Sequence, residues 1–397
     1  MTHTWTTAID ALLERAVATG AVPGAVAVVA GPEGVRHVAA AGRLRVDGDA
    51  PVTPDTMFRY MSMTKALTSV AALQLIEQGR LGLDQEVASV LPAFAELPVL
   101  DGFDGNTPRL RPPARAATIR HLLTHTSGLA YDFADANLLH HLRATGTPPP
   151  LSGLHAAIAI PLIADPGTRW SYGVSTDWLG QVVEAVSGQH LAAYLGDHVF
   201  GPLGMHDTTF APSDEQRARM MTVHHRETDG GLVAGTVELN AEPEFWPGGH
   251  GAHGTAGDYG RFLAALLGGG ALDGQRILAR ETVELAFSDH LGGLPLPEFM
   301  ESAVPELSND IVSMPFAQGW GLGFHLMTED IPGMRRAGSG DWAGLFNSYY
   351  WVDRTTGVAA ALLTQVLPFF DGPIIETALG LEQTVYAGVA APEGAPA

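Results

Sequence analysis

Apolar residues near the two ends of the chain fall into short runs that are typical of strands. Residues 22–30 and 35–42 form two such runs, and the Gly-Pro-Glu-Gly turn at 31–34 predicts that they pair as a β-hairpin. Before this hairpin, the helical spacing of apolar residues over 3–19 predicts an amphipathic helix. Towards the other end, a last helix is predicted over about 373–387. It follows three strand-like runs at 320–327, 345–352 and 358–366.

The middle of the chain shows the spacing of helices. Residues 63–78 are apolar nearly all round, which predicts a buried helix that ends at Gly79. Thr118 is a candidate cap for a short helix over 119–125. Further helices are predicted over 176–187, 190–199 and 256–267. Loops are predicted at 101–115, 145–153 and 289–317, and the last is long enough to form a lid.

This distribution of elements predicts an α/β protein of the α+β kind, in which helices flank one antiparallel sheet and a mainly helical domain is attached. The two ends, residues 1–60 and 315–390, are predicted to form the sheet domain together. Residues 61–314 are predicted to form the helical domain, and the tail 391–397 to be disordered. A site is expected in the cleft between the two domains.

The composition excludes several kinds of partner and site. The chain has 397 residues, with 43 acidic against 22 basic side chains and a formal net charge of −21. Because nucleic acids and anionic membranes attract clustered positive charge, neither is expected as a partner. The absence of cysteine excludes disulfides, cysteine-ligated metals and a cysteine nucleophile. No apolar run approaches the roughly 18 residues of a membrane span, and Asp10 and Glu14 interrupt the region where a secretory signal is apolar, so a cytoplasmic location is expected.

The basic residues are distributed unevenly between the two residue types. They comprise 21 Arg and a single Lys, Lys65. Arg serves as well as Lys for surface charge, but only Lys can lose its proton at ordinary pH. Lys65 is therefore a candidate for a role that requires a neutral amine; the alternative is a surface Lys retained by chance.

Ser62 and Lys65 are three residues apart at the predicted start of the helix over 63–78. This spacing places both side chains on one face of the helix, within reach of a hydrogen bond. A neutral amine can remove the proton from a Ser hydroxyl and so make it nucleophilic, and N–H groups at a helix start favour a developing oxyanion. The pair is predicted to be catalytic; the alternative is a capping Ser followed by a solvated Lys.

Two further motifs could complete such a site. Tyr172 precedes the helix over 176–187, and a Tyr hydroxyl beside a Lys can pass a proton to a leaving group. Residues 341–345 lead into a predicted strand, where Gly344 would let a ligand approach closely and the Leu345 N–H could bind an oxyanion. Each motif also has a simpler interpretation, since Tyr172 could be a packing residue and the segment an ordinary entry into a strand.

Other chemistries have weaker motifs. His121 and His125 have a spacing found in metal sites, but the segment lacks the Glu of a zinc protease and has no evident third ligand. The Gly-rich run at 248–251 lacks the Lys-Ser/Thr of a phosphate-binding loop. No Gly-x-Ser-x-Gly sequence occurs, which argues against an α/β-hydrolase. Neither a metal nor another cofactor is expected.

The order of the motifs resembles that of the serine β-lactamase and penicillin-binding-protein-like superfamily, in which Ser-x-x-Lys is followed by a Tyr motif and a strand motif. The resemblance extends over most of the chain. Its segments are MFRYMSMTK, IRHLLTHTSGL, DPGTRWSYG, PLGMHDTTF, GGHGAHGTAGDYGRFL and DWAGLFNSYYWVD. Within the superfamily, the chain is most similar to the family VIII carboxylesterases and the acyltransferases of the simvastatin-synthase type.

The resemblance implies a role for each matched residue. Ser62 would be the nucleophile, Lys65 its base and Tyr172 a proton relay. The backbone N–H groups of Ser62 and Leu345 would form the oxyanion hole. Candidates for substrate binding come from the same or neighbouring segments: Tyr131, Trp170, His250, Trp342 and Gly344.

Two departures from the β-lactamase pattern bear on the substrate. Val174 replaces the Asn of the Tyr-x-Asn motif, and Trp342 replaces the Lys of the third motif, as in the esterase branch. In the β-lactamases those groups bind the amide and the carboxylate of the substrate. The resemblance therefore implies a serine esterase that cleaves small or medium acyl esters through an acyl-enzyme on Ser62. The alternatives are an acyltransferase with the same acyl-enzyme, a β-lactamase or DD-peptidase-like enzyme, and a non-catalytic binding module.

Overall fold

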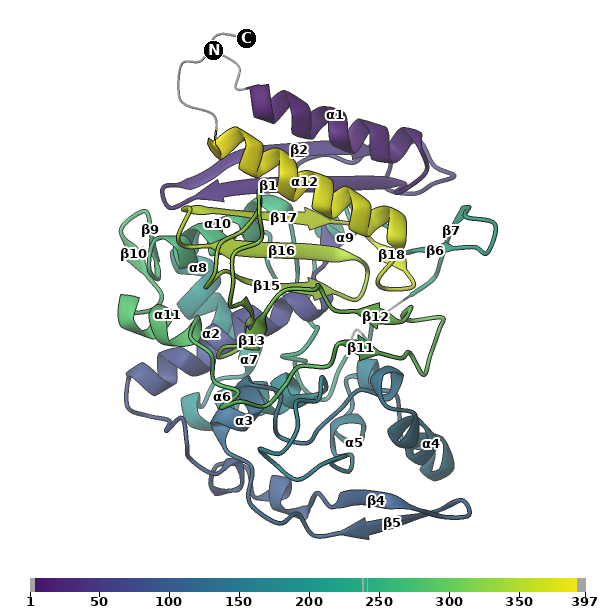
Figure 1. Cartoon of the computed structure of the whole chain (residues 1–397), viewed down its shortest axis with the longest axis vertical. Coiled ribbons are helices and arrows are strands. Elements are labelled where there is room, and N and C mark those ends of the chain that lie inside the picture. Colours follow the sequence, from purple (N-terminus) through teal and green to yellow (C-terminus); the bar gives the residue numbers. More distant parts are fainter. Residues whose placement is uncertain (1–3, 238, 241, 391–397) are drawn as a thin grey trace.

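A seven-stranded antiparallel sheet forms the centre of the computed structural model, which describes residues 4–390 except 238 and 241 (Figure 1). The strand order is β13-β14-β15-β16-β17-β1-β2. The strands are β1 (Gly24–Gly31), β2 (Gly34–Gly42), β13 (Gln318–Trp320), β14 (His325–Met327), β15 (Gly340–Gly344), β16 (Ser348–Asp353) and β17 (Val358–Leu363). The two ends of the chain meet where β1 pairs with β17, with Val26 opposite Leu363. The predicted pairing of the two ends in one antiparallel sheet is confirmed.

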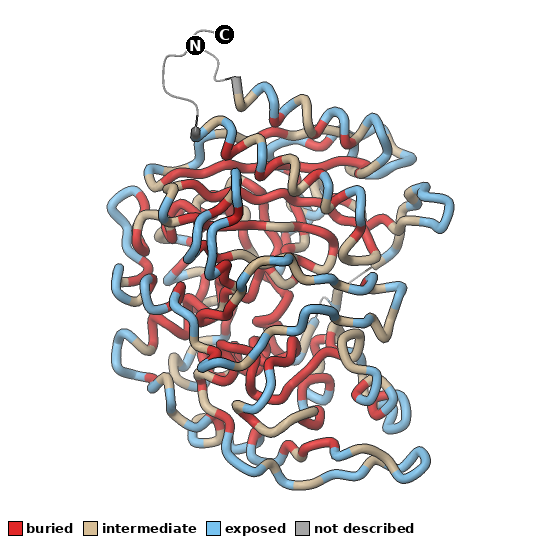
Figure 2. Tube along the Cα trace, in the orientation of Figure 1, coloured by how far each residue is buried: buried red, intermediate tan, exposed pale blue. Residues whose placement is uncertain are grey.

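Helices cover both faces of this sheet. α1 (Thr4–Ala18) and α12 (Gly372–Ala390) lie against one face, the outer face (Figure 1). On the opposite, inner face, α10 (Ala256–Leu267) packs against β1 and β17. Because both faces are covered, every residue of β1 and β17 is buried, as Figure 2 shows in red. This explains why these strands appear in the sequence as continuous apolar runs.

The inner face also adjoins the largest apolar core, which is built around α2 (Thr64–Glu77). All residues of α2 from Thr64 to Leu75 are buried, as the apolar pattern predicted. α2 packs against α6 (Ser175–Ser187). The other α-helices are α3 (Ile119–Leu123), α4 (Ala136–Thr145), α5 (His155–Ile158), α7 (Leu191–Leu195), α8 (Gly201–Leu203), α9 (Asp214–Ala218) and α11 (Arg280–Ala286).

Short strands outside the main sheet form small sheets that connect loops. They are β3 (Phe58–Arg59) with β8 (His253–Gly254), β4 (Val99–Asp104) with β5 (Thr107–Arg111), β9 (Ala271–Leu272) with β10 (Gln275–Arg276), β11 (Phe299–Met300) with β12 (Ile311–Val312), and β6 (His224–Arg226) between β7 (Leu232–Ala234) and β18 (Val366–Leu367). The β3–β8 pair joins the segment that leads to Ser62 to the segment that follows His250.

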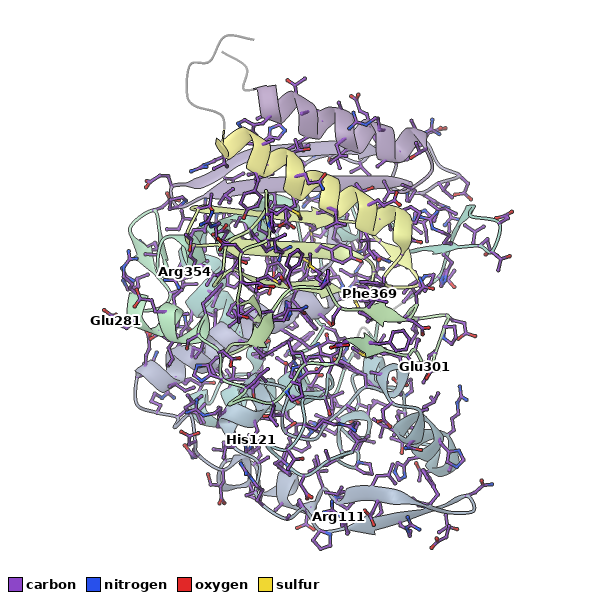
Figure 3. The ribbon with its side chains drawn as sticks, in the orientation of Figure 1. Arg111, His121, Glu281, Glu301, Arg354 and Phe369 are labelled. Atoms are coloured by element: carbon purple, nitrogen blue, oxygen red, sulfur yellow. The ribbon has the colours of Figure 1, made fainter. Side chains whose placement is uncertain are left out.

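Several predicted elements differ from those observed. The predicted loop over 101–115 contains most of the β4–β5 hairpin, at the end of the molecule away from α1 (Figure 3, Arg111). Much of this hairpin is exposed, so it lacks the apolar alternation that marks a half-buried strand. The short helix α4 was also not predicted; it begins where Asp135 accepts a hydrogen bond from the Leu138 N–H.

Two predicted strands were placed wrongly near the end of the chain. The run 320–327 is a hairpin, β13 and β14, because the chain reverses at Gly323, whose φ is +94°. The run 345–352 begins as a turn, and β16 starts only at Ser348. Asn347 stabilises this turn with a φ of +59°, and its side chain donates hydrogen bonds to the carbonyl oxygens of Val366 and Pro368.

The architecture is the predicted α/β arrangement of an antiparallel sheet with helices. The division into a sheet domain and a helical domain stays a prediction. α10 falls within the segment predicted as the helical domain, and it packs on the sheet. The predicted disordered tail, 391–397, lies outside the described residues. Within the described part of the chain, no helix combines the length and the apolar character needed to cross a membrane.

Candidate active site

Ser62 lies in a turn with an uncommon backbone conformation. The 3₁₀ segment Met61–Met63 continues directly into α2, and Met61 has a φ of +49°, which non-glycine residues seldom adopt. The end of β15 approaches this turn closely. A Cβ atom on Gly344 would lie 2.5 Å from the Tyr60 carbonyl oxygen, so only glycine fits there without a shift. The turn and the strand together place Ser62 beside the end of β15.

Lys65, in the first turn of α2, is only 2% exposed. Its Nζ atom lies 3.0 Å from Ser62 Oγ, which is the contact expected from their spacing of three residues. Nζ also donates to Tyr131 Oη at 3.0 Å and to the Gly249 carbonyl oxygen at 2.9 Å. None of these three partners is charged. The amine is therefore held in place by neutral groups, with Ser62 Oγ in position to exchange a proton with it.

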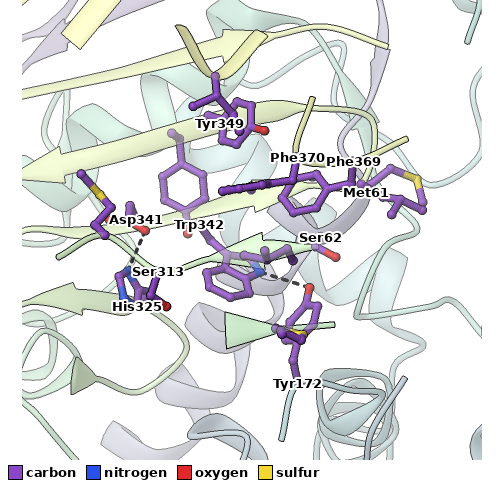
Figure 4. A pocket seen from close by; sticks show the side chains of 18 of the residues that line it. Met61, Ser62, Tyr172, Ser313, His325, Asp341, Trp342, Tyr349, Phe369 and Phe370 are labelled. Carbon is purple, nitrogen blue, oxygen red and sulfur yellow. Dashed lines mark hydrogen bonds and ion pairs between the residues drawn. The ribbon is translucent and has the colours of Figure 1, made fainter. Parts of the chain in front are cut away.

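Two tyrosine rings lie beside the Lys65 amine, but their hydroxyls have different partners. Nζ is 5.1 Å from the centre of the Tyr131 ring and 4.8 Å from that of Tyr172. Tyr131 Oη is bonded to Lys65, whereas Tyr172 Oη accepts a hydrogen bond of 3.1 Å from Trp342 Nε1 (Figure 4). Burial raises the pKa of Tyr131 well above its ordinary value, so this hydroxyl stays protonated. Tyr131, expected only as a substrate-binding residue, is thus in direct contact with Lys65.

Asp177 supports this arrangement, and sequence analysis missed it. It lies in the first turn of α6 and is 1% exposed, and its Oδ1 atom accepts a hydrogen bond of 2.9 Å from the Gly249 N–H. Asp177 therefore holds the residue whose carbonyl oxygen binds Lys65. Burial raises the pKa of Asp177 to about 6, an effect that the charge of Lys65 partly opposes. The only signal in the sequence was an acidic residue near the start of a largely apolar helix.

His250 lies next to this carboxyl group and is neutral. Its Nδ1 atom is 3.7 Å from Asp177 Oδ1. Burial and the charge of Lys65 lower the pKa of His250 to about 3. The contact between His250 and Asp177 is therefore not an ion pair at neutral pH.

Asp177→Asn is expected to change how stability depends on pH. The pKa of Asp177 is raised from 3.8 to about 6 on folding, so the folded protein binds a proton more tightly than the unfolded chain. The contribution of Asp177 to the stability of wild type therefore falls as the pH rises from about 4 to about 6. Asn cannot ionise, so the variant shows no such fall. The free energy of unfolding of the variant, relative to that of wild type, should therefore rise by about 2 kcal/mol between about pH 4 and pH 7.

Urea unfolding at the two pH values measures this difference. Asn keeps an oxygen that can accept the Gly249 hydrogen bond, so the comparison isolates the ionisation. Asp214→Asn is the matched control, because Asp214 is exposed on α9. A gap between variant and wild type that stays constant with pH, as in the control, would contradict the assignment of the raised pKa.

The predicted site residues other than Lys65 line one cavity of about 740 Å³, and Lys65 lies behind Ser62 (Figure 4). Its lining includes Ser62, Tyr131, Trp170, Tyr172, His250, Trp342, Gly344 and Leu345. Trp342 packs edge-on against Tyr172 and Trp320, with ring centres 5.0 Å and 4.7 Å apart. The wall near Ser62 is thus largely aromatic, which suits an apolar substrate. Ser62 and Leu345 both border the cavity, and their role as an oxyanion hole stays a prediction.

The two histidines with metal-site spacing have other roles in the structure. The Nδ1 atom of His121 accepts a hydrogen bond from the Thr118 N–H and so completes the cap of α3. His125 is buried against the rings of Tyr172 and Trp320. Neither histidine belongs to a group of three or more potential metal ligands among the residues that the structure describes.

Comparison with known proteins identifies the family of this chain. A family model described as Beta-lactamase matches residues 9–382, which is nearly the whole chain. The chain belongs to the Beta-lactamase family. The resemblance and the fold predicted from the motifs are thereby confirmed. The family match covers the segments that carry Ser62, Tyr172 and Trp342.

Several of the curated relatives are named as enzymes of acyl chemistry. Monacolin J acid methylbutanoyltransferase from Aspergillus terreus is 33% identical, over 96% of this chain and 95% of its own. Lovastatin esterase from Penicillium rubens is 32% identical, over 92% of this chain and 94% of its own. Among solved structures, a mutant of simvastatin synthase from Aspergillus terreus is 30% identical, with a TM-score of 0.84 over 97% of this chain and 95% of that one. The chain therefore belongs with serine hydrolases and acyltransferases of the β-lactamase fold.

Proposed function

We propose that the protein is a serine carboxylesterase that cleaves small or medium acyl esters through an acyl-enzyme on Ser62. The observation that carries this proposal is the distance of 3.0 Å between Lys65 Nζ and Ser62 Oγ, at the wall of a large apolar cavity. The relative named lovastatin esterase supports ester cleavage as the reaction. Trp342, in place of a carboxylate-binding Lys, favours an ester over a β-lactam.

In the first half of the reaction, neutral Lys65 takes the proton from Ser62 Oγ while that oxygen attacks the ester carbonyl carbon. The carbonyl oxygen becomes an oxyanion, which the N–H groups of Ser62 and Leu345 stabilise. The bond from carbon to the alcohol oxygen then breaks. The leaving alkoxide takes a proton from Tyr172, which is replenished from the Lys65 ammonium group, and Ser62 keeps the acyl group.

The second half repeats these steps with water in place of the alcohol. Water gives a proton to Lys65 and attacks the acyl carbon, and the collapse of the intermediate returns a proton to Ser62 Oγ. The carboxylic acid then leaves.

Trp342 has a supporting role in this mechanism. Its N–H donates to a lone pair of Tyr172 Oη, so the Tyr172 O–H proton points away from Trp342.

An acyltransferase is the second candidate, favoured by the relative named methylbutanoyltransferase. The same acyl-enzyme would then react with an alcohol or an amine rather than with water. The cavity of about 740 Å³ is large enough to hold an acceptor molecule beside the acyl group. The catalytic residues would be unchanged.

Hydrolysis of p-nitrophenyl butyrate by the purified protein tests the proposed function. Steady hydrolysis in water supports an esterase, and slow turnover that accelerates when an alcohol is added supports a transferase. If the protein neither hydrolyses the ester nor is labelled by a serine-reactive phosphonate, both the esterase and the transferase assignments are contradicted. That result would support a binding module. The Ser62→Ala variant serves as the control for spontaneous hydrolysis.

Tyr172→Phe is expected to lower kcat for ester hydrolysis by about 10²-fold with little change in KM, because the hydroxyl acts on a proton in transfer. The ring stays in place against Trp342, so binding is preserved. Steady-state kinetics on ethyl butyrate, followed by acid release, measures the effect, because ethoxide requires a proton to leave whereas p-nitrophenolate does not.

Tyr131→Phe is the matched comparison, since it removes the other hydroxyl beside Lys65. We expect a smaller loss, because Gly249 still holds Lys65. If Tyr172→Phe costs less than about threefold while Tyr131→Phe costs about 10²-fold, Tyr131 is the proton relay and the assignment to Tyr172 is wrong.

A further inference from the structure

The cavity at Ser62 extends beyond the inner face of the sheet. Trp342 and Tyr350 contact the main core on the inner face, whereas Tyr349 and Leu362 belong to the core beneath α1 and α12. Tyr349 and Leu362 nevertheless line the same cavity as Ser62. In Figure 4, Tyr349 lies above Trp342, and Tyr172 lies below it. The cavity therefore reaches both faces of the strands that carry the site.

The edge of β15 provides the passage between the two faces. β14 pairs with β15 only at Gly340 and Asp341, so residues 342–344 have β16 on one side and no partner from β14 on the other. Trp342, Ala343 and Gly344 all line the cavity. Around this unpaired edge the cavity continues onto the outer face, where it meets Ala378 and Leu379 of α12. We call this continuation the outer-face branch.

A cover over the branch comes from the predicted lid. Leu296, Leu307 and Ile311, within the segment 289–317, line the cavity. The lid is fastened to the loop after β18, because the Phe369 N–H donates to the Leu307 carbonyl oxygen at 2.8 Å and the Asn309 N–H donates to the Phe369 carbonyl oxygen at 2.9 Å. Figure 3 shows Phe369 beside β11 and β12. The branch is therefore an apolar channel between the sheet, α12 and the lid.

Charged groups border the far part of the branch. Arg335 Nε and Nη2 donate to the two carboxylate oxygens of Glu382, at 2.9 Å and 2.7 Å, and Arg335 Nη1 donates to Asp341. All three residues line the cavity. His325 Nδ1 also lies 2.9 Å from Asp341 Oδ1, so Arg335 and His325 together pair both carboxylates, and the guanidinium is already bound to carboxylate oxygens. A ligand in the branch should therefore be apolar and should not end in a carboxylate.

The position of Tyr172 decides whether the alcohol part or the acyl part of an ester enters the branch. This step rests on the proposed function, in which Tyr172 protonates the leaving alcohol. The alcohol then departs on the Tyr172 side of Trp342. The acyl substituent extends from the carbonyl carbon in the other direction, where Phe369, Phe370 and Tyr349 lie (Figure 4).

We propose that the outer-face branch holds the acyl chain of the substrate, so that the enzyme prefers esters of unbranched medium-chain acids, of octanoyl to decanoyl length, over acetyl and butyryl esters. Each methylene buried in an apolar channel adds to binding in the transition state. A short acyl group leaves the branch empty. A chain that ends in a carboxylate is rejected by Glu382 and Asp341.

The test compares p-nitrophenyl decanoate with p-nitrophenyl butyrate. Wild type should show a kcat/KM for the decanoate at least about tenfold above that for the butyrate. Ala378→Phe places a ring in the branch, away from Ser62, and should lower kcat/KM for the decanoate about tenfold while changing that for the butyrate less than about twofold. Ala378→Leu should have an intermediate effect. Ala387→Phe, exposed on the same helix, is the control and should change neither value.

A wild-type preference for the butyrate, or equal losses on both esters in Ala378→Phe, would overturn the proposal. Binding to Ser62→Ala separates it from the proposed function. Calorimetric titration with methyl decanoate should show binding that Ala378→Phe weakens, whether or not the wild type hydrolyses esters. If the wild type hydrolyses esters but Ala378→Phe leaves this binding unchanged, the acyl chain lies elsewhere while the esterase assignment stands.

Discussion

Lys65→Arg is expected to lower kcat/KM for ester hydrolysis by about 10³-fold, nearly as much as Lys65→Ala. Arg keeps the positive charge and approximately the length of Lys, but it does not give up its proton at any pH the protein tolerates. If Lys65 acts only through its charge, Arg should largely replace it. If Lys65 is the base for Ser62, the Lys65→Arg variant should be inactive. The chain itself uses Arg at every other basic position, so the substitution separates the two roles.

The buried position of Lys65 requires a control for folding. A guanidinium is broader than an ammonium and must fit between Tyr131 and Gly249. Lys65→Met provides the second variant, since it has a similar length, no charge and no base. Circular dichroism and thermal unfolding should show both variants folded, and both should be inactive. Retention of a third of the wild-type activity by Lys65→Arg would mean that the base is another group, with Tyr172 the first to examine.

Ser62→Ala is expected to reduce ester hydrolysis to the background rate, because the variant lacks the aliphatic hydroxyl beside Lys65 Nζ. Tyr131, the other hydroxyl at this amine, is a phenol whose pKa is raised by burial, so it stays protonated and does not act as the nucleophile. The fold should be unaffected. Lys65 keeps its hydrogen bonds to Tyr131 and Gly249, and the turn over Met61–Met63 does not depend on a hydrogen bond from the Ser62 side chain. The melting temperature should therefore stay within a few degrees of that of wild type.

Ser313→Ala is the matched control for this variant. Ser313 lines the same cavity, but its hydroxyl donates to the Pro297 carbonyl oxygen rather than to an amine. Its replacement should leave kcat within about twofold of wild type. Ser62→Ala activity above a few per cent of wild type, with the control unchanged, would remove Ser62 from the role of nucleophile.

Local features of the sequence were sufficient to predict the centre of the site. The spacing of Ser62 and Lys65 places both side chains on one helix face whatever the rest of the fold does, and the contact of 3.0 Å follows from it. The continuous apolar runs of β1 and β17 likewise indicated strands, and the structure shows that every residue of both is buried. These features depend only on the backbone geometry of a few consecutive residues, so the local sequence is sufficient to predict them.

The supporting residues depend on contacts between distant segments. Tyr131 reaches Lys65 across 66 positions of sequence and Asp177 reaches Gly249 across 72, so no local spacing marks either contact. The contribution of α12 to the cavity has the same origin, because it arises from the unpaired edge of β15 and the packing of the lid. The β4–β5 hairpin was missed for another reason: its exposed strands have no apolar alternation.

The most direct test of the central claim is to trap the acyl group on Ser62. The protein is mixed with p-nitrophenyl butyrate, quenched in acid within one turnover, digested with trypsin and analysed by mass spectrometry. Cleavage after Arg59 and Lys65 releases residues 60–65, in which Ser62 is the only serine. We expect this peptide to carry one butyryl group, located at Ser62 by fragmentation and absent from Ser62→Ala. Rapid ester hydrolysis with the butyryl group on another residue, or on none, would contradict the proposed mechanism.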